Sequence, residues 1–146
     1  MTELVNGIVA IGSQGQIGLN GGIPWITDDY EGVVKDDLAW FAKLTAGGVL
    51  IVGYKTFEEM KALGFKNKDR AIEIWTGRDQ GPGGFLGTVR RRNGDRPIWI
   101  CGGGKTFDAF AFFINRWHIS TIPYPGPADV YFDNQWLFGR KTHDRP

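Results

Sequence analysis

Two adjacent carboxylates open an apolar segment, DDLAWF, at residues 36–41. In one interpretation they cap a helix, because acidic side chains at a helix start accept hydrogen bonds from free N–H groups and are favoured by the helix dipole. Asp36 alone would suffice for that role. If the helix begins near Asp37, this residue shares a face with Leu38 and Phe41 and its carboxylate points toward the interior. A half-buried carboxylate is costly unless it is paired, so Asp37 is either satisfied by a polar neighbour or kept for proton chemistry.

Three consecutive glycines, Gly102, Gly103 and Gly104, follow an apolar segment and precede residues with helical periodicity. Glycines at a strand-to-helix junction let backbone N–H groups approach an anion, with the positive end of the helix dipole behind them. Lys105 and Thr106 can add a charge and a hydroxyl. The spacing matches neither G-x-G-x-x-G nor a P-loop. The triplet therefore indicates an anion site of another type, or a tight turn that binds nothing.

Two other predicted strands end in similar residues, in the segments VGYKT (52–56) and TGR (76–78). Ligands of open α/β sheets lie beyond the carboxyl ends of the strands, so these segments and the glycine triplet are expected at one edge. Together they indicate a site for a phosphate-rich cofactor, with Lys55 and Arg78 available for an additional phosphate. Any one of the segments alone would more often be ordinary surface.

The elements that position these residues follow from hydrophobic periodicity. Short apolar, β-branched segments predict strands, and apolar residues at i, i+3, i+4 and i+7 predict helices. The predicted strands lie in 4–12, 47–53, 70–77, 98–101 and 116–122, and the predicted helices cover 37–45, 55–63 and a segment with Phe107, Phe110, Ala111 and Ile114 on one face. Alternating strands and helices predict a parallel sheet. The segment TVRRRNGDRP (88–97) is predicted as a short edge strand with a turn at Asn93–Gly94, and only partial order is expected beyond Phe138.

Composition narrows the class of protein. A chain of 146 residues fits one domain with its own core. The single cysteine and two scattered histidines give no disulfide and no metal-ligand spacing, which favours a reducing cytoplasm. The net charge of +1 gives no reason to expect nucleic acid as a partner, and the apolar runs are too short to span a membrane. The start, MTELVNG, is not typical of a signal peptide.

Five segments occur in the order and close to the spacing of dihydrofolate reductase: IVAIGSQGQIGLNGGIPW, DDLAWFAKLT, VLIVGYKTFEEM, DRAIEIWTGR and IWICGGGKTFDAF. Residues 4–133 thus resemble that family. The resemblance implies a single α/β domain over 1–146, a three-layer fold with a central, mainly parallel sheet flanked by helices. It also implies a cleft for NADPH and 7,8-dihydrofolate, and reduction of the substrate to tetrahydrofolate by hydride transfer coupled to protonation at N5.

The resemblance also implies roles for individual residues. Asp37 matches the carboxylate that promotes protonation, Trp25 a tryptophan that orders water near the pterin, and Ser120 a threonine linked to the carboxylate. Arg70 matches the arginine that binds the α-carboxylate of the substrate, and the other implied substrate contacts are Ile8, Val9, Ile23, Leu38, Phe41 and Cys101. The implied cofactor contacts are Ala10, Ile17, Gly18, Gly53, Tyr54, Lys55, Thr56, Thr76, Gly77, Arg78, Gly102, Gly103, Gly104, Lys105, Thr106 and Phe107.

Three departures from the family pattern bear on these expectations. The segment TDDYEGVVK (27–35) lengthens the connection between Trp25 and Asp37, and Tyr54 stands where the family usually has an arginine for cofactor phosphates. The sequence stops before two antiparallel strands that the family adds, so an uncovered sheet edge and either a monomer or a homodimer are expected. Two other functions stay open: the related pyrimidine reductase of riboflavin synthesis, and a catalytically inactive descendant that binds nucleotide or has a structural role.

Overall fold

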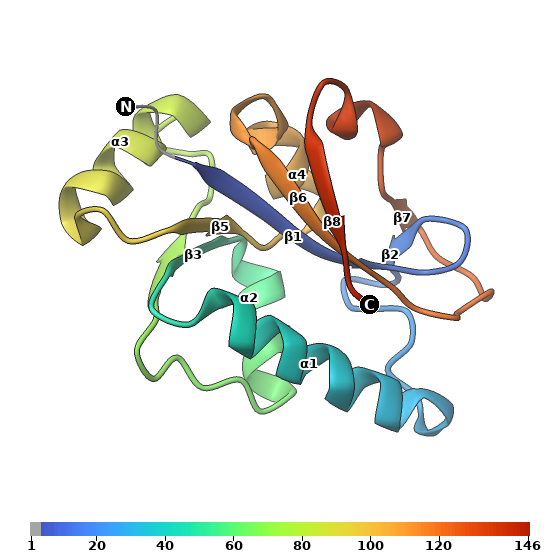
Figure 1. Ribbon diagram of the computed structural model, residues 1–146. Helices are drawn as coiled ribbons and strands as arrows, with labels where there is room; N and C mark the ends of the chain where they lie inside the picture. Colours follow the sequence, from blue (N-terminus) through green and yellow to red (C-terminus); the bar gives the residue numbers. More distant parts are fainter. Residues whose placement is uncertain (1–3) are drawn as a thin grey trace.

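A central sheet of six strands organises the computed structural model, which describes residues 4–146 (Figure 1). All its strand pairs are parallel, in the order β4-β3-β5-β1-β6-β8. The strands are β1 (Val5–Ile11), β3 (Val49–Val52), β4 (Ala71–Ile74), β5 (Ile98–Ile100), β6 (Arg116–Thr121) and β8 (Lys141–Asp144). A separate antiparallel pair joins β2 (Gln16–Gly18) to β7 (Val130–Tyr131). The predicted parallel sheet is confirmed.

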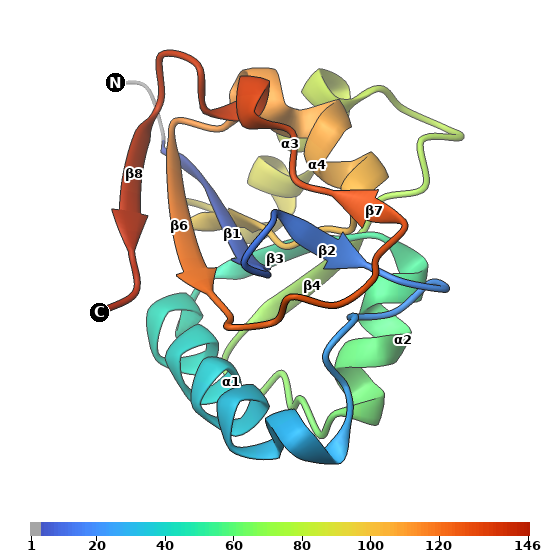
Figure 2. The same ribbon diagram turned by 90° about the vertical axis from the view of Figure 1, so that its right-hand side faces the viewer.

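Helices cover both faces of the sheet. The helices α1 (Glu31–Thr45) and α2 (Tyr54–Ala62) lie on one face, and α3 (Pro82–Asn93) and α4 (Gly104–Phe110) lie on the other (Figures 1 and 2). Strand residues alternate between the two layers because successive side chains point to opposite faces. Leu50 packs in the cluster that includes residues of α1 and α2, whereas Val49 and Ile51 pack in the cluster that includes residues of α3 and α4. The result is the three-layer α/β fold expected from the resemblance.

The arginine-rich segment forms a helix, so the predicted edge strand at 88–97 is wrong. Pro82 occupies the first turn of α3, and Gly94 ends the helix with a positive φ of 65°. These are the helix start and stop signals that proline and glycine give at those positions. The predicted Asn93–Gly94 turn is thus the end of a helix. Arg92 forms an ion pair with Glu73 of β4, with Nη1 and Oε1 2.8 Å apart.

The helix that carries the two carboxylates begins earlier than predicted. A short 3-10 helix, η1 (Asp28–Tyr30), leads into α1 at Glu31, so the extra segment 27–35 supplies the first turns of the helix. Asp36 therefore lies inside the helix, exposed to solvent, and caps nothing. The prediction that Asp36 caps the helix is wrong, whereas Asp37 is partly buried, as predicted.

The segment around Phe107 is helical but shorter than the periodicity suggests. The helix α4 ends at Phe110 and continues as a 3-10 turn, η2 (Ala111–Phe113). Phe107, Phe110 and Ile114 are nevertheless buried together in the core, as their spacing predicted.

The segment after Phe138 is ordered, which contradicts the expectation of partial order. A 3-10 turn, η3 (Asn134–Leu137), precedes β8, which pairs in parallel with β6 from Arg116↔Lys141 to Ile119↔Asp144. The strand β8 thus covers one edge of β6 and is itself an outer strand of the sheet (Figure 2). Within residues 4–146, no helix is long and apolar enough to cross a membrane.

Candidate active site

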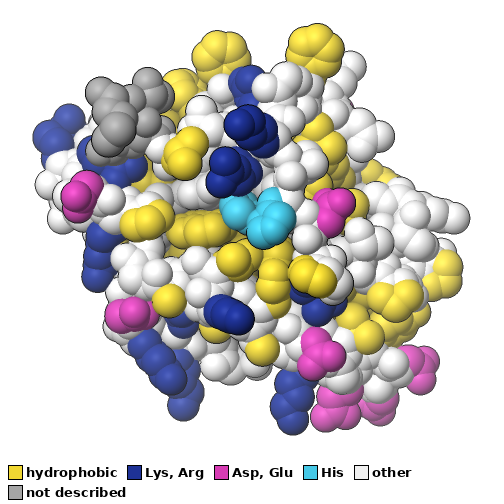
Figure 3. All heavy atoms as spheres, viewed as in Figure 1, with side chains coloured by type: hydrophobic (Ala, Val, Ile, Leu, Met, Phe, Trp, Pro, Cys, Tyr) yellow, Lys and Arg dark blue, Asp and Glu magenta, His cyan; other side chains and the backbone are white. Residues whose placement is uncertain are grey.

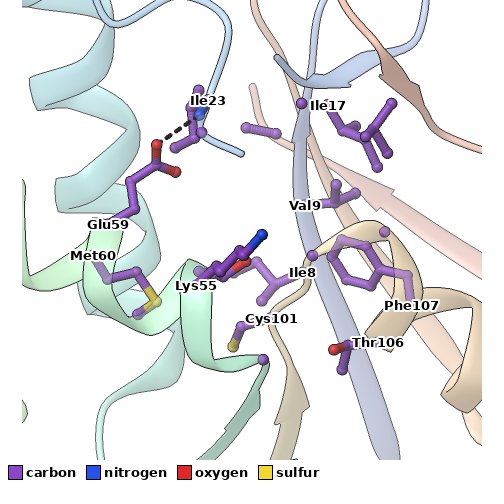
Figure 4. Close-up of a pocket in the computed structure, with 18 of the residues that line it drawn as sticks. Ile8, Val9, Ile17, Ile23, Lys55, Glu59, Met60, Cys101, Thr106 and Phe107 are labelled. Atoms are coloured by element: carbon purple, nitrogen blue, oxygen red, sulfur yellow. Dashed lines mark hydrogen bonds between the residues drawn. The ribbon is translucent and has the colours of Figure 1, made fainter. Parts of the chain in front are cut away.

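A cavity of about 730 Å³ opens at the carboxyl ends of β1, β3 and β5, between α1, α2 and α4. This is the edge at which an open parallel sheet binds its ligands. Figure 4 shows Glu59 and Met60 of α2 on one side, Thr106 and Phe107 of α4 on the other, and β1 between them. Most residues implied by the resemblance line this cavity: Ile8, Val9, Ala10, Ile17, Gly18, Ile23, Trp25, Asp37, Leu38, Phe41, Gly53, Tyr54, Lys55, Thr56, Thr76, Arg78, Cys101, Gly103, Gly104, Lys105, Thr106 and Phe107.

Asp37 places a carboxylate in a wall that is otherwise largely apolar. Its side chain is 19% exposed, and its Oδ1 is buried without a partner in hydrogen-bonding geometry among residues 4–146. Burial raises the pKa of Asp37, while the nearby Ser120 hydroxyl, by hydrogen bonding, and the charge of Arg145 act in the opposite direction. The carboxyl group therefore takes up a proton closer to neutral pH than an exposed aspartate would.

Ser120 and Trp25 support this wall in different ways. Ser120 is fully buried on β6 and does not line the cavity; its hydroxyl accepts a hydrogen bond from Arg145 Nε at 2.7 Å. Trp25 lines the cavity but is only 2% exposed, and it packs against Tyr124 with ring centroids 5.8 Å apart. Ser120 thus lies behind Asp37, and Trp25 is a rigid part of the wall.

The opposite end of the cavity is a cradle of glycines and threonines. An ideal Cβ on Gly53 would lie 3.1 Å from Thr106 Oγ1, and one on Gly103 would lie 3.1 Å from Thr56 Oγ1. Any side chain there would push the threonines out of place, so the two loops approach each other through bare backbone. A Cβ on Gly104 would meet Val130 Cγ1 at 2.7 Å. The cradle therefore exposes backbone N–H groups beside two hydroxyls, an arrangement that suits a phosphate.

Cationic side chains surround that cradle. Lys55, Arg78 and Lys105 line the cavity from α2, the loop after β4 and α4, and all three are exposed. Tyr54 lines it beside Lys55. Gly77 and Gly102 do not line the cavity; both have positive φ, 78° and 103°, so they shape the loops that carry the site. Among the described residues, no His, Cys, Asp and Glu side chains group as metal ligands.

Arg70 lies in a second cavity, of about 530 Å³, that shares Leu38, Phe41, Leu63 and Phe65 with the first. Its guanidinium donates hydrogen bonds to the carbonyls of Ala42 and Lys66 at 3.1 and 2.7 Å, while its buried Nε has no partner in the described part of the chain. The arginine is thus partly committed to the fold, but one buried donor stays free. Lys43, Lys66 and Lys68 line the same cavity together with one acid, Asp69, so the cavity is basic on balance.

Comparison with known proteins agrees with this geometry. A family model described as "Dihydrofolate reductase" matches residues 4–73. A dihydromethanopterin reductase from Methylorubrum extorquens is 36% identical over 132 residues, which cover 90% of this chain and 92% of that protein. The chain belongs to the dihydrofolate reductase family. Dihydrofolate reductase 1 of Haloarcula marismortui is 28% identical, covering 98% of this chain and 87% of its own length, and dihydrofolate reductase type 15 of Escherichia coli is 28% identical, covering 86% and 78%.

Several lining residues of this dihydrofolate reductase family member were missed from the sequence. Neither the motifs nor the resemblance pointed to Trp40 and Met60, yet both line the cavity, as do Gly21, Gly22, Glu59, Leu63, Phe65, Trp75 and Val130. Glu59 accepts a hydrogen bond from the backbone N of Ile23 at 2.7 Å and so ties the glycine-rich loop to α2 (Figure 4). Burial raises the pKa of Glu59. Met60 lies four residues after Thr56 on α2, and residues at this spacing share a helix face. The assignment of Thr56 to the cleft therefore predicts that Met60 lies near it.

Proposed function

We propose that the protein reduces 7,8-dihydrofolate to tetrahydrofolate with NADPH. One observation carries the proposal: a single cleft has a half-buried carboxylate, Asp37, in an apolar wall at one end and a glycine cradle ringed by cations at the other. A flat, polar-edged ring that needs a proton fits the first end. A dinucleotide with phosphates fits the second.

Asp37 performs the proton chemistry in this proposal. Its carboxyl group accepts a hydrogen bond from an N–H group of the pterin and holds the ring in one orientation. Because burial raises its pKa, the carboxyl group holds a proton at higher pH than an exposed aspartate would, and so favours protonation at N5. Leu38 and Phe41, on the same helix, exclude water from the faces of the ring.

The residues around the cradle fit NADPH, which supplies a hydride when it is bound. The backbone at Gly103 and Gly104 and the hydroxyls of Thr56 and Thr106 bind the pyrophosphate. Ala10, Ile17 and Gly18 line the part of the cleft that the nicotinamide would occupy, and they offer it an apolar surface. Lys55 and Arg78 bind the additional phosphate that distinguishes NADPH from NADH, since Tyr54 offers no positive charge.

Replacing Arg78 with glutamine is expected to weaken NADPH binding about 10-fold or more while NADH binding changes little, because only the phosphorylated nucleotide loses a charge-assisted hydrogen bond. Lys55→Gln is expected to act in the same direction. The measurement is the Kd of each nucleotide by fluorescence titration, with Lys61→Gln as the control, since Lys61 is an exposed lysine of α2 that does not line the cavity. Equal loss of both nucleotides would contradict the assignment.

Replacing Arg70 with lysine is expected to raise KM for dihydrofolate about 10-fold or more and to leave NADPH affinity unchanged. Lysine keeps the charge but cannot supply the forked donors that a carboxylate accepts. Lys68→Gln, in the same cavity, is the matched control for a general loss of positive charge. If both ligands weaken in parallel, Arg70 serves the fold through Ala42 and Lys66 and does not anchor substrate.

A second candidate substrate is dihydromethanopterin. It is favoured by the relative from Methylorubrum extorquens, which carries that name and aligns over nearly its whole length. The same wall around Asp37 would hold either pterin, and the two substrates would differ in the tail that reaches the basic cavity at Arg70. The pyrimidine reductase alternative gives no role to Arg70.

The test is oxidation of NADPH by the purified protein, followed by absorbance, with dihydrofolate and with dihydromethanopterin in parallel. Turnover with dihydrofolate that methotrexate inhibits supports the proposal. Turnover with dihydromethanopterin alone transfers the assignment to that substrate. A folded protein that binds NADPH and turns over neither would favour a pyrimidine substrate or an inactive descendant.

A further inference from the structure

The outermost strand of the sheet brings a cation to the carboxylate of the cleft. Arg145 follows β8 directly, and its backbone N donates to the carbonyl of Ile119 at 2.8 Å. Its side chain turns inward, where Nε donates to the hydroxyl of Ser120 at 2.7 Å and lies 4.0 Å from Asp37 Oδ1. The side chain of Arg145 is 23% exposed, so solvent screens this pair less than it would a surface ion pair.

The position of Arg145 depends on β8, which is held on β6 by more than backbone pairing. His118 of β6 and His143 of β8 are opposite each other in the register, with Nδ1 atoms 3.3 Å apart. Figure 3 shows the histidine side chains side by side on the face of the molecule that β8 covers. His118 also packs on Trp99, with ring centroids 4.9 Å apart. These contacts fix the strand that delivers Arg145.

Other charged groups near Asp37 do not replace Arg145. On α1, the neighbours in sequence, Lys35 and Asp36, are exposed, and on α2 Glu59 lines the same cavity. Besides His118 and His143, the strands β6 and β8 carry Arg116, Lys141 and Asp144. Burial, with the charges of His143 and Arg116, lowers the pKa of His118 to about 4, so His118 is uncharged at neutral pH.

We propose that Arg145 is a positioning residue for the reduction, which β8 supplies to orient Asp37 through Ser120 and to stabilise its ionised form. The proposal rests on the proposed function of Asp37 as the proton-handling group. Ser120 accepts a hydrogen bond from Arg145, which leaves the proton of its own hydroxyl for the carboxyl group of Asp37. Arg145 therefore restrains the Ser120 hydroxyl, and its charge opposes the rise in the pKa of Asp37 that burial causes.

The test replaces Arg145 with glutamine and follows Asp37 by ¹³C NMR of labelled aspartate carboxyl groups in the protein without ligands. Asp37→Asn identifies the signal. Removal of the positive charge is expected to move the titration of Asp37 about one pH unit higher, because an opposite charge at this distance favours the ionised form. Arg145→Lys, which keeps the charge, is expected to move it less. Lys141→Gln removes the charge of an exposed residue on the same strand; it is the matched control and should leave the titration of Asp37 unchanged.

Kinetics provide the second measurement. If protonated Asp37 promotes the reaction, kcat/KM falls as pH rises through its pKa, and this descending limb moves to higher pH in R145Q.

An unchanged NMR titration in a folded R145Q protein overturns the proposal. A lower rate with an unmoved pH profile also overturns it, because Arg145 would then only support the fold. Should R145Q not fold, R145M serves as the neutral variant and is judged by the same titration. Because the NMR titration needs no substrate, a shifted titration without turnover would reject the proposed function and not the role of Arg145.

Discussion

Replacing Asp37 with asparagine is expected to lower kcat near neutral pH by about 10²–10⁴-fold, the range that positioned acid–base groups contribute. Asparagine keeps the size and can accept one hydrogen bond, but it cannot hold or release a proton. The measurement is the steady-state rate of NADPH oxidation with the substrate found active. A single turnover experiment would locate the loss at the chemical step, since the substitution leaves the glycine cradle proposed for NADPH untouched.

The matched control for this variant is Asp36→Asn. Asp36 is the adjacent carboxylate of α1, is exposed and does not line the cavity. The D36N variant should retain wild-type activity. An active D37N protein, or equal losses in both variants, would contradict the role given to Asp37.

Stability gives an independent check on the same variant. Burial holds the pKa of Asp37 above its ordinary value. A carboxyl group with a raised folded-state pKa favours folding below its unfolded pKa, and this contribution is lost as pH rises through the folded pKa. Above the folded pKa the ionised group therefore opposes folding, so in that pH range D37N is expected to have a Tm equal to or above that of the wild type. Loss of activity together with a kept or raised Tm is the pattern of a functional residue.

The sequence predicted the sheet well because its strands are short, apolar and bounded by glycine. Val49–Val52 illustrates this, since a strand buried on both faces has a continuous apolar sequence. The prediction that three strand ends meet was also sound, because parallel strands place their carboxyl ends at one edge. The resemblance then assigned individual residues that periodicity alone could not assign.

Other features depended on contacts that a local pattern does not contain. The Asn93–Gly94 pair favours a hairpin turn and so predicts a strand at Arg90 to Arg92, whereas in the structure Pro82 starts a helix that runs to Asn93. The strand β8 has no apolar periodicity; its pairing partner, β6, is far away in sequence. For the same reason the sequence does not connect Arg145 with Asp37, or show that His118 is buried beneath that strand.

The second large effect is expected in the core, at Trp117 of β6. This side chain is fully buried, stacks on Trp136 with planes 6° apart, and meets Phe107 and Phe132 at centroid distances of 5.4 and 5.1 Å. Its ring also lies over Gly7, where a Cβ would come within 2.7 Å of Trp117 Cε3. Replacing Trp117 with alanine is expected to cost about 3–5 kcal/mol of the free energy of unfolding. That is a large part of the roughly 5–15 kcal/mol that holds a domain together, and Tm should fall by roughly 6–20 °C.

Trp117→Phe is the matched variant that separates packing from polarity. The indole Nε1 of Trp117 is buried and has no hydrogen-bond partner among the described residues, so phenylalanine removes an unsatisfied donor while it keeps a ring against Phe107. W117F should therefore lose much less stability than W117A in the same thermal or urea titration; comparable losses would contradict the packing argument. Because Phe107 lines the cleft from α4, beside the threonine of the glycine cradle, a collapse into the cavity left by W117A would also move the cofactor end of the site. At a temperature where both variants are folded, NADPH affinity should then fall in W117A and stay near wild type in W117F.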